Sequence, residues 1–391
     1  MSRGTREILI DRRGTLRRAA VLTDGELTDL HIDRIDRPPL SGAVFLGRVA
    51  RIAAGLDAAF VDIGTGAPGL LPAADVRPRA RDARIGTLLR TGQPVLVQAK
   101  ADSVGRKGAL LTMDATLPGR FLVAAPFLDG ITVSKRLGRG PERARLSALV
   151  RDAAPPGLGW IVRADAATAD PGLVALEAEA LAVAWRDAQR AAAGAAAPAL
   201  LLPSPTAVAR ALVEQGGPGL TRIAVDGPEA LAEVRAWCRD RAPDLERLAR
   251  PHVDRVALFE TGDLEQEISA LMEPLVPLPD GGSLVIERTE ALTAIDVNGG
   301  EKGNALATNL AAAREIARQL RLRNVGGIVV VDFINLDRAG EREQLIQALS
   351  GAVSEDPGNT HVYGMSRLGL VEMTRQRRGP ALADLAGPLE P

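Results

Sequence analysis

Residues 284–298 read LVIERTEALTAIDVN, and residues 308–333 read TNLAAAREIARQLRLRNVGGIVVVDF. Each stretch contains a short apolar run that is interrupted by one aspartate, Asp296 in the first and Asp332 in the second. A carboxylate inside an apolar strand is costly unless it is paired with a cation or bound to a metal. The pattern therefore favours a catalytic metal site. The alternative, that both aspartates are structural and cap turns or helix starts, stays open on the local pattern alone.

A strand, a helix and a second strand follow one another here. The apolar runs 292–297 and 328–333 predict short buried strands. Between them, apolar residues recur at helical spacing: Leu306, Leu310, Ala313, Ala317 and Leu320. Asn324, with Gly326 and Gly327 after it, predicts the end of the helix. In such a βαβ unit the strands are parallel neighbours, so both aspartates are expected near the carboxyl ends, where open α/β sheets bind ligands.

This geometry points to a particular kind of metal ion. Neighbouring strands lie about 5 Å apart, so two carboxylates there repel one another unless a cation lies between them. Oxygen ligands at this spacing suit Mg²⁺, with Mn²⁺ as an alternative. Strand alternation places Asn298 on the same face as Asp296, provided that the strand continues that far. We expect the Asn298 amide to orient a carboxylate or a phosphate oxygen.

The whole chain sets wider limits. Its 391 residues are enough for two or three domains, and its net charge of −1 gives no global basic signature, so any nucleic-acid contact must be local. Cys238 is the only cysteine and there are three histidines, so we expect no disulfide within the chain and no zinc site. The first residues have no apolar signal core, and no apolar run is long enough for a membrane span. We expect a soluble cytoplasmic protein.

The first 200 residues indicate a barrel and a second compact unit. Residues 1–37 predict a strand-rich start, and short strands with turn signals between 41 and 115 predict a small β-barrel, for which an oligonucleotide-binding (OB) fold is one candidate. Phe60 is one of only six phenylalanines, and the basic residues expected to line a phosphate-following groove on the barrel are Arg48, Arg51, Arg106 and Lys107. For Phe60, a place in the core is the more common alternative. Residues 117–200 end in an Ala-rich helix and linker.

Arginines gather in two places. Arg314, Arg318 and Arg321 share one face of the predicted helix. A second group lies in the last predicted strand and just beyond it: Arg367, Arg375, Arg377 and Arg378. Arginine clusters favour bidentate phosphate contacts, although a charged helix face is more often simply solvated.

Several of these segments together resemble the bacterial ribonuclease E/G family. EALTAIDVN at 290–298, the segment 308–334 and SRLGLVEMTRQR at 366–377 look like its catalytic signature. GRVARIAAGLDAAFVDIG at 47–64 resembles its RNA-binding barrel, and LPDGGSLVI at 278–286 resembles the segment that opens its catalytic domain. The resemblance extends across nearly the whole chain, and the short form is closer to the ribonuclease G branch.

The resemblance implies a multidomain α/β fold. An RNase H-like subdomain is split around an OB-type barrel and a 5′-sensor region, and a DNase I-like α/β catalytic domain follows. The first and second parts of the RNase H-like subdomain are expected at 1–38 and 201–278. The barrel is expected at 39–116, the sensor-like region at 117–200 and the catalytic domain at 279–391.

The resemblance also implies a function, namely Mg²⁺-dependent endoribonuclease activity. Such an enzyme cleaves single-stranded RNA to 5′-phosphate and 3′-hydroxyl ends, in rRNA processing or mRNA decay. Asp296 and Asp332 would hold Mg²⁺, and Asn298 would complete the catalytic group. The RNA-binding residues expected from the barrel, the sensor and the C-terminal arginine cluster are Phe60, Lys107, Arg163, Arg367 and Arg375.

The chain departs from the family's pattern in its RNA-handling parts. Where the family reads a 5′-monophosphate with an Arg-Thr pair and a later basic residue, this chain has Ala164 after Arg163, and then Asn359. The loss of a hydroxyl and of a charge should weaken phosphate recognition. Leu70 replaces a second barrel aromatic, and the loop 299–307 is short.

The family's cysteine pair for zinc is also missing, since the sequence ends at Pro391 without it. We therefore expect no zinc-linked tetramer, whereas a homodimer through other surfaces remains compatible with the sequence. Two alternatives to the enzyme stay open. One is a catalytically weakened homologue that binds RNA, and the other is a metal-dependent phosphohydrolase that acts on small substrates.

Overall fold

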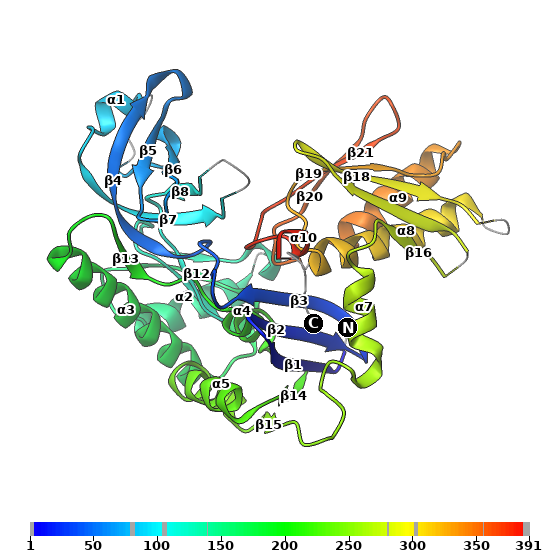
Figure 1. The fold of residues 1–391 in the computed structure, drawn as a ribbon, viewed down its shortest axis with the longest axis horizontal. Coiled ribbons are helices and arrows are strands. Elements are labelled where there is room, and N and C mark those ends of the chain that lie inside the picture. Colours follow the sequence, from blue (N-terminus) through cyan, green and yellow to red (C-terminus); the bar gives the residue numbers. More distant parts are fainter. Residues whose placement is uncertain are drawn as a thin grey trace. The chain divides into compact units, whose positions relative to one another are not determined.

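The computed structural model describes residues 4–78, 83–103, 108–138, 140–279, 281–300, 304–354 and 356–385. Within these ranges the protein is mixed α/β, and its strands form four sheets (Figure 1). The chain divides into two compact units. Unit 1 comprises Met1–Arg17 and Asp33–His252, and unit 2 comprises Arg18–Ile32 and Val253–Pro391. Among the described helices, none combines the length and the apolarity that a membrane span requires.

The strand-rich start that the sequence predicts is confirmed. Strands with runs of buried residues form the first sheet, in the order β15-β14-β1-β2-β3, with β1 and β14 parallel. The turn between β2 and β3 has left-handed backbone at Asp24 and Gly25. The bounds are β1 (Arg6–Arg13), β2 (Leu16–Thr23), β3 (Glu26–Arg34), β14 (Leu220–Val225) and β15 (Ala249–Pro251).

The predicted β-barrel is also confirmed. Five strands form a closed, OB-like ring, because β4 pairs with both β5 and β7. They are β4 (Val44–Ala53), β5 (Ala58–Asp62), β6 (Gly69–Pro72), β7 (Pro94–Ala101) and β8 (Leu110–Thr112). Alternate side chains such as Val61 and Leu111 fill the interior. Gly69 permits this packing, since a Cβ atom there would lie 2.6 Å from Leu111 Cδ1. A sixth strand, β13 (Ala199–Leu202), pairs with β4, although the sequence predicted a linker there.

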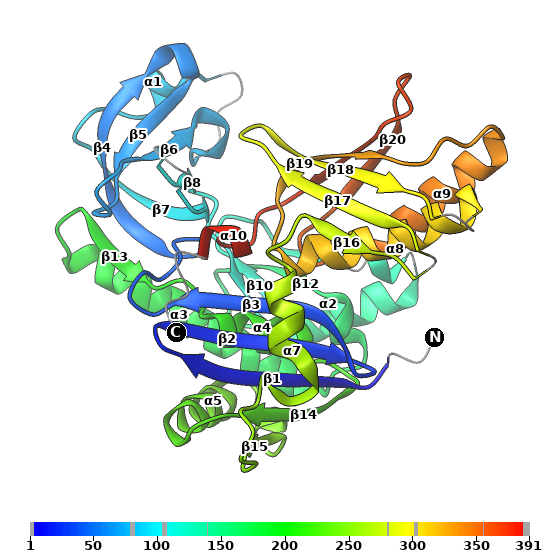
Figure 2. The same ribbon diagram turned by 45° about the vertical axis from the view of Figure 1, so that its right-hand side comes forward.

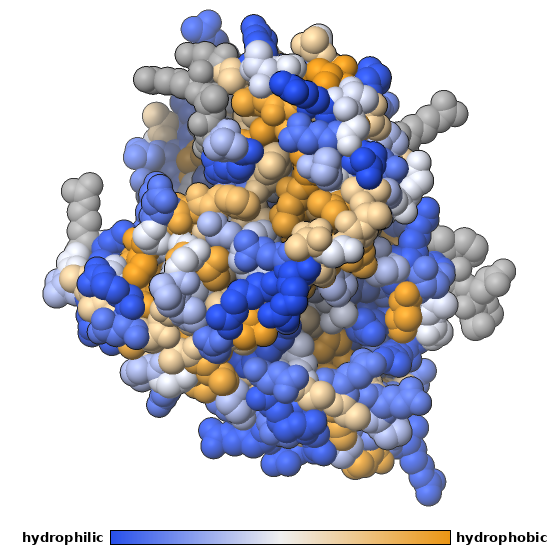
Figure 3. All heavy atoms as spheres, turned by 90° about the vertical axis from the view of Figure 1, so that its left-hand side faces the viewer, coloured by the Kyte–Doolittle hydropathy of each residue, from blue (hydrophilic) through white to orange (hydrophobic). Residues whose placement is uncertain are grey.

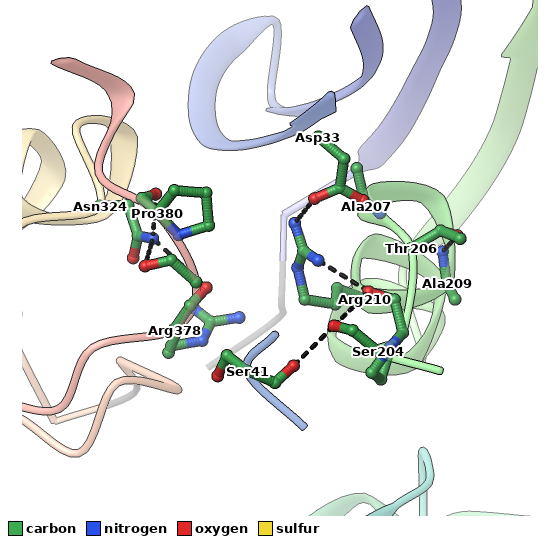
Figure 4. Close-up of polar contacts among 12 residues, drawn as sticks. Asp33, Ser41, Ser204, Thr206, Ala207, Ala209, Arg210, Asn324, Arg378 and Pro380 are labelled. Carbon is green, nitrogen blue, oxygen red and sulfur yellow. Dashed lines mark hydrogen bonds and ion pairs between the residues drawn. The ribbon is translucent and has the colours of Figure 1, made fainter. Parts of the chain in front are cut away.

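The rest of unit 1 contains a four-stranded sheet with helices around it. The sheet order is β11-β12-β10-β9. The bounds are β9 (Leu117–Pro118), β10 (Leu122–Ala125), β11 (Ile131–Val133), β12 (Gly159–Val162), α2 (Pro141–Ala153), α3 (Pro171–Gly194), α4 (Ala207–Gln215) and α5 (Pro228–Arg241). Buried polar contacts tie these elements together. Glu177 of α3 accepts three backbone N–H bonds of 2.7–2.8 Å, and Arg210 of α4 binds Asp33 of β3 at 2.7 Å (Figure 4).

Unit 2 is built on a six-stranded sheet in the order β16-β17-β18-β19-β21-β20. The strands are β16 (Leu275–Pro277), β17 (Ser283–Arg288), β18 (Leu292–Asn298), β19 (Gly327–Asp332), β20 (His361–Met365) and β21 (Val371–Arg375). Two helices, α8 (Ala305–Leu322) and α9 (Ala339–Ala352), cover one face of it (Figure 2). The short helices α7 (Leu264–Ala270) and α10 (Leu382–Leu385) complete the described part of the unit.

Asparagines define both ends of α8, as the sequence suggests for its C-terminal end. Asn304 caps the start, because its side-chain oxygen accepts from the backbone N–H of Leu306 at 2.9 Å. At the other end Asn324 adopts left-handed backbone, with φ of 48°. Its amide also donates to the backbone carbonyls of residues 378–380, at 2.8–3.3 Å (Figure 4). The helix end therefore also holds the C-terminal segment.

Two arginines of α8 anchor the β2–β3 hairpin within unit 2. Arg318 Nε donates to the Leu27 carbonyl at 2.8 Å, and Arg321 Nε donates to the Thr28 carbonyl at 3.2 Å. The third arginine of this face, Arg314, is exposed. The sequence suggested either a solvated face or a phosphate-binding one. Arg318 and Arg321 instead have a structural role, which helical spacing could not reveal because the hairpin is almost 300 residues away in the sequence.

A buried ion pair holds β21. The Arg375 side chain is 1% exposed and that of Asp356 is 3% exposed, and Arg375 Nε donates to Asp356 Oδ2 at 2.7 Å. Arg375 also donates to the Val325 carbonyl at 2.7 Å. Burial acts to raise the pKa of Asp356, but the hydrogen bonds and charge of Arg375 outweigh it, so the pKa lies below its ordinary value. Asp356 is therefore the charged partner of Arg375 at neutral pH.

We predict that Arg375→Ala destabilises the protein by about 3–5 kcal/mol, since it leaves the Asp356 carboxylate buried without its partner. The free energy of unfolding, from urea denaturation followed by circular dichroism, measures this. The control is Arg367→Ala, because Arg367 is exposed and its removal should change stability by less than about 0.5 kcal/mol. Equal stability of the two variants would refute the structural role of the pair.

Candidate metal and RNA-binding site

The structure brings the two predicted metal ligands together. β18 and β19 are parallel neighbours, and Asp296 is the register partner of Asp332 in the ladder. Asp332 is the last residue of β19, and Asp296 lies two residues before the end of β18. Both carboxylates therefore lie at the carboxyl ends of adjacent parallel strands, as expected from the βαβ pattern.

The burial of these strands differs from the expectation. On β18, Thr293, Ile295 and Val297 are buried, whereas Asp296 and Asn298 are exposed. Asp332 is likewise exposed between the buried residues Val331 and Phe333. The apolar runs are thus strands with one covered face, and the aspartates belong to the open face.

The physical case for a metal changes accordingly. Because Asp296 and Asp332 are exposed, neither carboxylate bears the free-energy cost of a buried charge, and burial gives no reason to expect a cation here. Their mutual repulsion remains, because carboxylates on neighbouring strands interact at a separation of about 5 Å. A divalent cation would relieve this repulsion and would still leave coordination positions open to solvent or substrate.

Asn298 completes the group on the open face. Its Nδ2 donates to Asp296 Oδ2 at 2.9 Å, so the amide orients the carboxylate as the alternation of β18 predicts. Among the described residues there is no cluster of three or more His, Cys, Asp or Glu side chains suited to a metal. The donor set is therefore a carboxylate pair with a neighbouring amide. This set suits Mg²⁺, which is usually bound by one or two carboxylates and by substrate phosphate.

A buried asparagine supports the segment that follows Asp332. Asn309, in the first turns of α8, is 0% exposed. Its amide donates to the Ile334 carbonyl at 2.7 Å and accepts from the Ile334 N–H at 3.1 Å. Asn309 was not identified from the sequence. The feature that could have identified it is a polar side chain on the buried, otherwise apolar face of the helix. The neighbouring loop includes residues 301–303, outside the described ranges, so the effect of its length stays a prediction.

Of the predicted RNA-binding residues of the barrel, the structure describes Phe60, which lies outside the barrel core. Phe60 is half-buried and is absent from the core, with the guanidinium of Arg51 4.4 Å from its ring centroid. Leu70, at the position expected to lack an aromatic, is the cross-strand partner of Phe60. The barrel, at the top of the space-filling view, shows apolar patches among hydrophilic side chains (Figure 3). Lys107, together with Arg106, lies outside the described residues.

Two basic positions have local partners. Arg163 is partly buried, and its Nη1 donates to the Gly119 carbonyl at 2.6 Å. Burial lowers the pKa of this guanidinium. Arg48, expected along the groove, donates to the carbonyls of Gly92 and Ala197 at 2.9 and 3.2 Å. Part of the hydrogen-bonding capacity of both arginines is therefore used within unit 1.

The C-terminal arginines separate into an exposed and a buried residue. Arg367 is exposed in the turn between β20 and β21. Since Val371 pairs with Val331, this turn lies at the same edge of the sheet as Asp332. Arg375, expected to bind RNA, is instead buried against Asp356, and no phosphate can reach it in this conformation. Arg375 therefore has a structural role in β21.

The fold and the site define a class of protein. It is a mixed α/β protein with a closed OB-like barrel in one unit and an exposed carboxylate pair on an open sheet in the other. Residues 116–378 match the sequence profile of the Ribonuclease E/G family. The chain belongs to this family, which confirms the resemblance.

Curated relatives agree with this assignment. The chain is 34% identical over 393 residues to ribonuclease G of Escherichia coli K12, which covers 95% of this chain and 80% of that protein. It is 33% identical to ribonuclease G of Haemophilus influenzae, which covers 96% of this chain and 80% of the relative. It is 35% identical over 361 residues to ribonuclease E of Synechocystis sp., where 88% of this chain matches 53% of the relative. The chain thus spans about half the length of that ribonuclease E.

We predict that Asn309→Ala weakens the site without touching the carboxylates. The substitution leaves the N–H and carbonyl of Ile334 without partners, at a cost of about 1–3 kcal/mol. The chain after Asp332 should then lose its fixed position, with a loss of about 10- to 100-fold in metal affinity. Titration of Mn²⁺ by electron paramagnetic resonance measures this affinity. The control is Asn304→Ala, which removes only the N-terminal cap of α8. Equal Mn²⁺ affinities of the two variants would refute the role of Asn309 in positioning the chain after Asp332.

Proposed function

We propose that the chain is a Mg²⁺-dependent endoribonuclease that cleaves single-stranded RNA to 5′-phosphate and 3′-hydroxyl ends, in RNA processing or decay. One observation carries the proposal. Asp296 and Asp332 are register partners on parallel strands, exposed on an open sheet face, in a member of the Ribonuclease E/G family. The relatives are named ribonuclease G and ribonuclease E, which supports the same substrate class.

The residues of the site have distinct tasks. Asp296 and Asp332 would hold the Mg²⁺, for which Mn²⁺ can substitute. Asn298 keeps Asp296 in place through its 2.9 Å hydrogen bond, and the second proton of its amide remains free to donate to a phosphate oxygen. When bound, the ion supplies stabilisation of charge on the scissile phosphate and a water molecule of lowered pKa.

Binding of the RNA chain is assigned to separate surfaces. On the barrel, Phe60 offers a partly exposed ring for stacking and Arg51 offers a nearby charge. Arg367, exposed at the carboxylate end of the unit 2 sheet, is placed to meet a phosphate. Lys107 stays a prediction, as do the boundaries of the RNase H-like, sensor and DNase I-like parts.

Recognition of a 5′-monophosphate is proposed to be weak. Ala164 has no hydroxyl, and Asn359 carries no charge and donates its amide to Gln376 Oε1 at 3.2 Å. A charged or hydroxyl partner at these positions would give stronger hydrogen bonds to phosphate. The enzyme is therefore expected to depend on contacts along the RNA chain more than on its 5′ end.

We predict that Asp296→Asn and Asp332→Asn each reduce cleavage by at least about 100-fold, since each removes one charged ligand of the ion. The measurement is the rate of cleavage of an A/U-rich single-stranded RNA, resolved on denaturing gels at saturating Mg²⁺. Both aspartates are exposed, so folding should be unchanged and RNA binding, measured by fluorescence anisotropy, largely retained.

The matched control is Asp337→Asn, which removes an exposed carboxylate in the loop after β19 and should cleave like the wild type. Full activity in both Asp296→Asn and Asp332→Asn would refute the metal assignment. RNA binding without cleavage by the wild-type protein would instead support the homologue that binds RNA without turnover.

A further inference from the structure

The sheet face that carries the carboxylates extends well beyond them. The opposite face packs against α8 and α9, whereas Asp296, Ile328 and Asp332 on the open face are exposed. Along β19, Ile328 is 50% exposed on the same face as Asp332, because the two are four residues apart. Ile328 pairs with Thr374 of β21, and Thr374 pairs with His361 of the edge strand β20.

Tyr363 lies on β20, the edge strand of this sheet. It is the only tyrosine in the chain, and it is 70% exposed. It lies at an irregularity in the β20–β21 ladder, between Val362 and Gly364. The hydroxyl of Thr374 donates to its phenol oxygen at 3.2 Å. The ring is thus tied to the open face, and the phenol proton remains free to donate outward.

The charge on this face decides which part of an RNA would contact it. Asp296, Asp332 and Glu372 are exposed there, and only the first two are proposed to bind a cation. A phosphate near Glu372 would be repelled. A base has no such penalty and gains by stacking on an aromatic ring.

The spacing fits one continuous strand of RNA. Through β21, the backbone of Tyr363 lies level with Val329 and Val330. It is therefore two to three residues, or roughly 8 Å, from Asp332 along the strands, and about 10 Å across on the second strand over. The path from the carboxylates to the ring is therefore a few nucleotides long. Ile328 lies beside Thr374, whose hydroxyl contacts the Tyr363 phenol, and its exposed side chain offers a second apolar contact near the ring.

We propose that Tyr363 is a base-stacking platform for single-stranded RNA, holding a nucleotide a few positions away from the phosphate at the Asp296–Asp332 site. This inference rests on the proposed ribonuclease function, which it deepens by adding a subsite on the catalytic sheet itself. Sequence reasoning missed Tyr363 because its position relative to Asp332 follows only from the order of β19, β21 and β20.

The test measures RNA binding apart from cleavage. In Mg²⁺-free buffer, the affinity of a fluorescent single-stranded RNA is compared for the wild type, Tyr363→Ala and Tyr363→Phe. Loss of the ring should weaken binding by about 5- to 150-fold, the range expected for one stacked base. Tyr363→Phe keeps the ring and should bind within about threefold of the wild type.

A scan of abasic positions identifies the stacked nucleotide. One abasic site should weaken binding to the wild type and have no effect on Tyr363→Ala, because both changes remove the same contact. Val253→Ala, which shortens another exposed side chain of the same unit that is 82% exposed, should leave RNA affinity unchanged. Circular dichroism and melting of Tyr363→Ala should match the wild type, since the ring is at the surface.

The outcomes separate this inference from the proposed function. If the wild type fails to cleave RNA, the binding comparison still decides the role of Tyr363. If the wild type cleaves RNA and Tyr363→Ala binds RNA with the affinity of the wild type, the proposed stacking role of Tyr363 is overturned. Unchanged RNA binding with a shift in sedimentation would assign Tyr363 to an interface between copies of the chain, and it would overturn the proposal equally.

Discussion

The parallel pairing of β18 with β19 is the constraint on which the candidate site depends. Its register makes Asp296 and Asp332 direct partners, and a shift of one residue would turn one of them towards the core. The helix between the two strands enforces this arrangement, because a parallel pair needs a crossover and α8 supplies it. Helix and strands share one apolar core, so the carboxylate pair is held by the packing of the whole sheet.

Polar contacts that are buried or half-buried fix the two ends of this arrangement. Asn309 holds the chain that follows Asp332, and Asn324 holds the segment that follows β21. The Arg375–Asp356 pair then secures β21 itself against the neighbouring loop. Asn309, Asp356 and Arg375 are buried and Asn324 is half-buried, and all of them are paired. In the same unit, the residues proposed to meet metal and RNA are exposed. The unit thus places its structural polar groups on the covered side of the sheet and its chemically available ones on the open side.

Much of this was predictable from sequence, and the failures share one cause. The barrel, the strand–helix–strand order and the alignment of Asp296 with Asp332 follow from periodicity and turn residues, which act locally. Burial of a single side chain depends on distant partners instead. Arg375 is buried because Asp356 lies beneath it, and Arg318 is engaged because the β2–β3 hairpin reaches α8. The positions of Asp296 and Asp332 on neighbouring strands were predicted correctly. The reason given for them, the cost of burying a charge, was wrong, because both side chains are exposed.

The central claim is that Asp296 and Asp332 together bind one divalent cation, and metal-directed cleavage of the protein tests it most directly. Fe²⁺ in place of Mg²⁺, with ascorbate and hydrogen peroxide, generates radicals that cut the backbone next to the bound ion. We predict cuts beside both Asp296 and Asp332, suppressed by excess Mg²⁺ and lost from both positions in Asp332→Asn. Cuts confined to other parts of the chain, or cuts unaffected by Asp332→Asn, would contradict it.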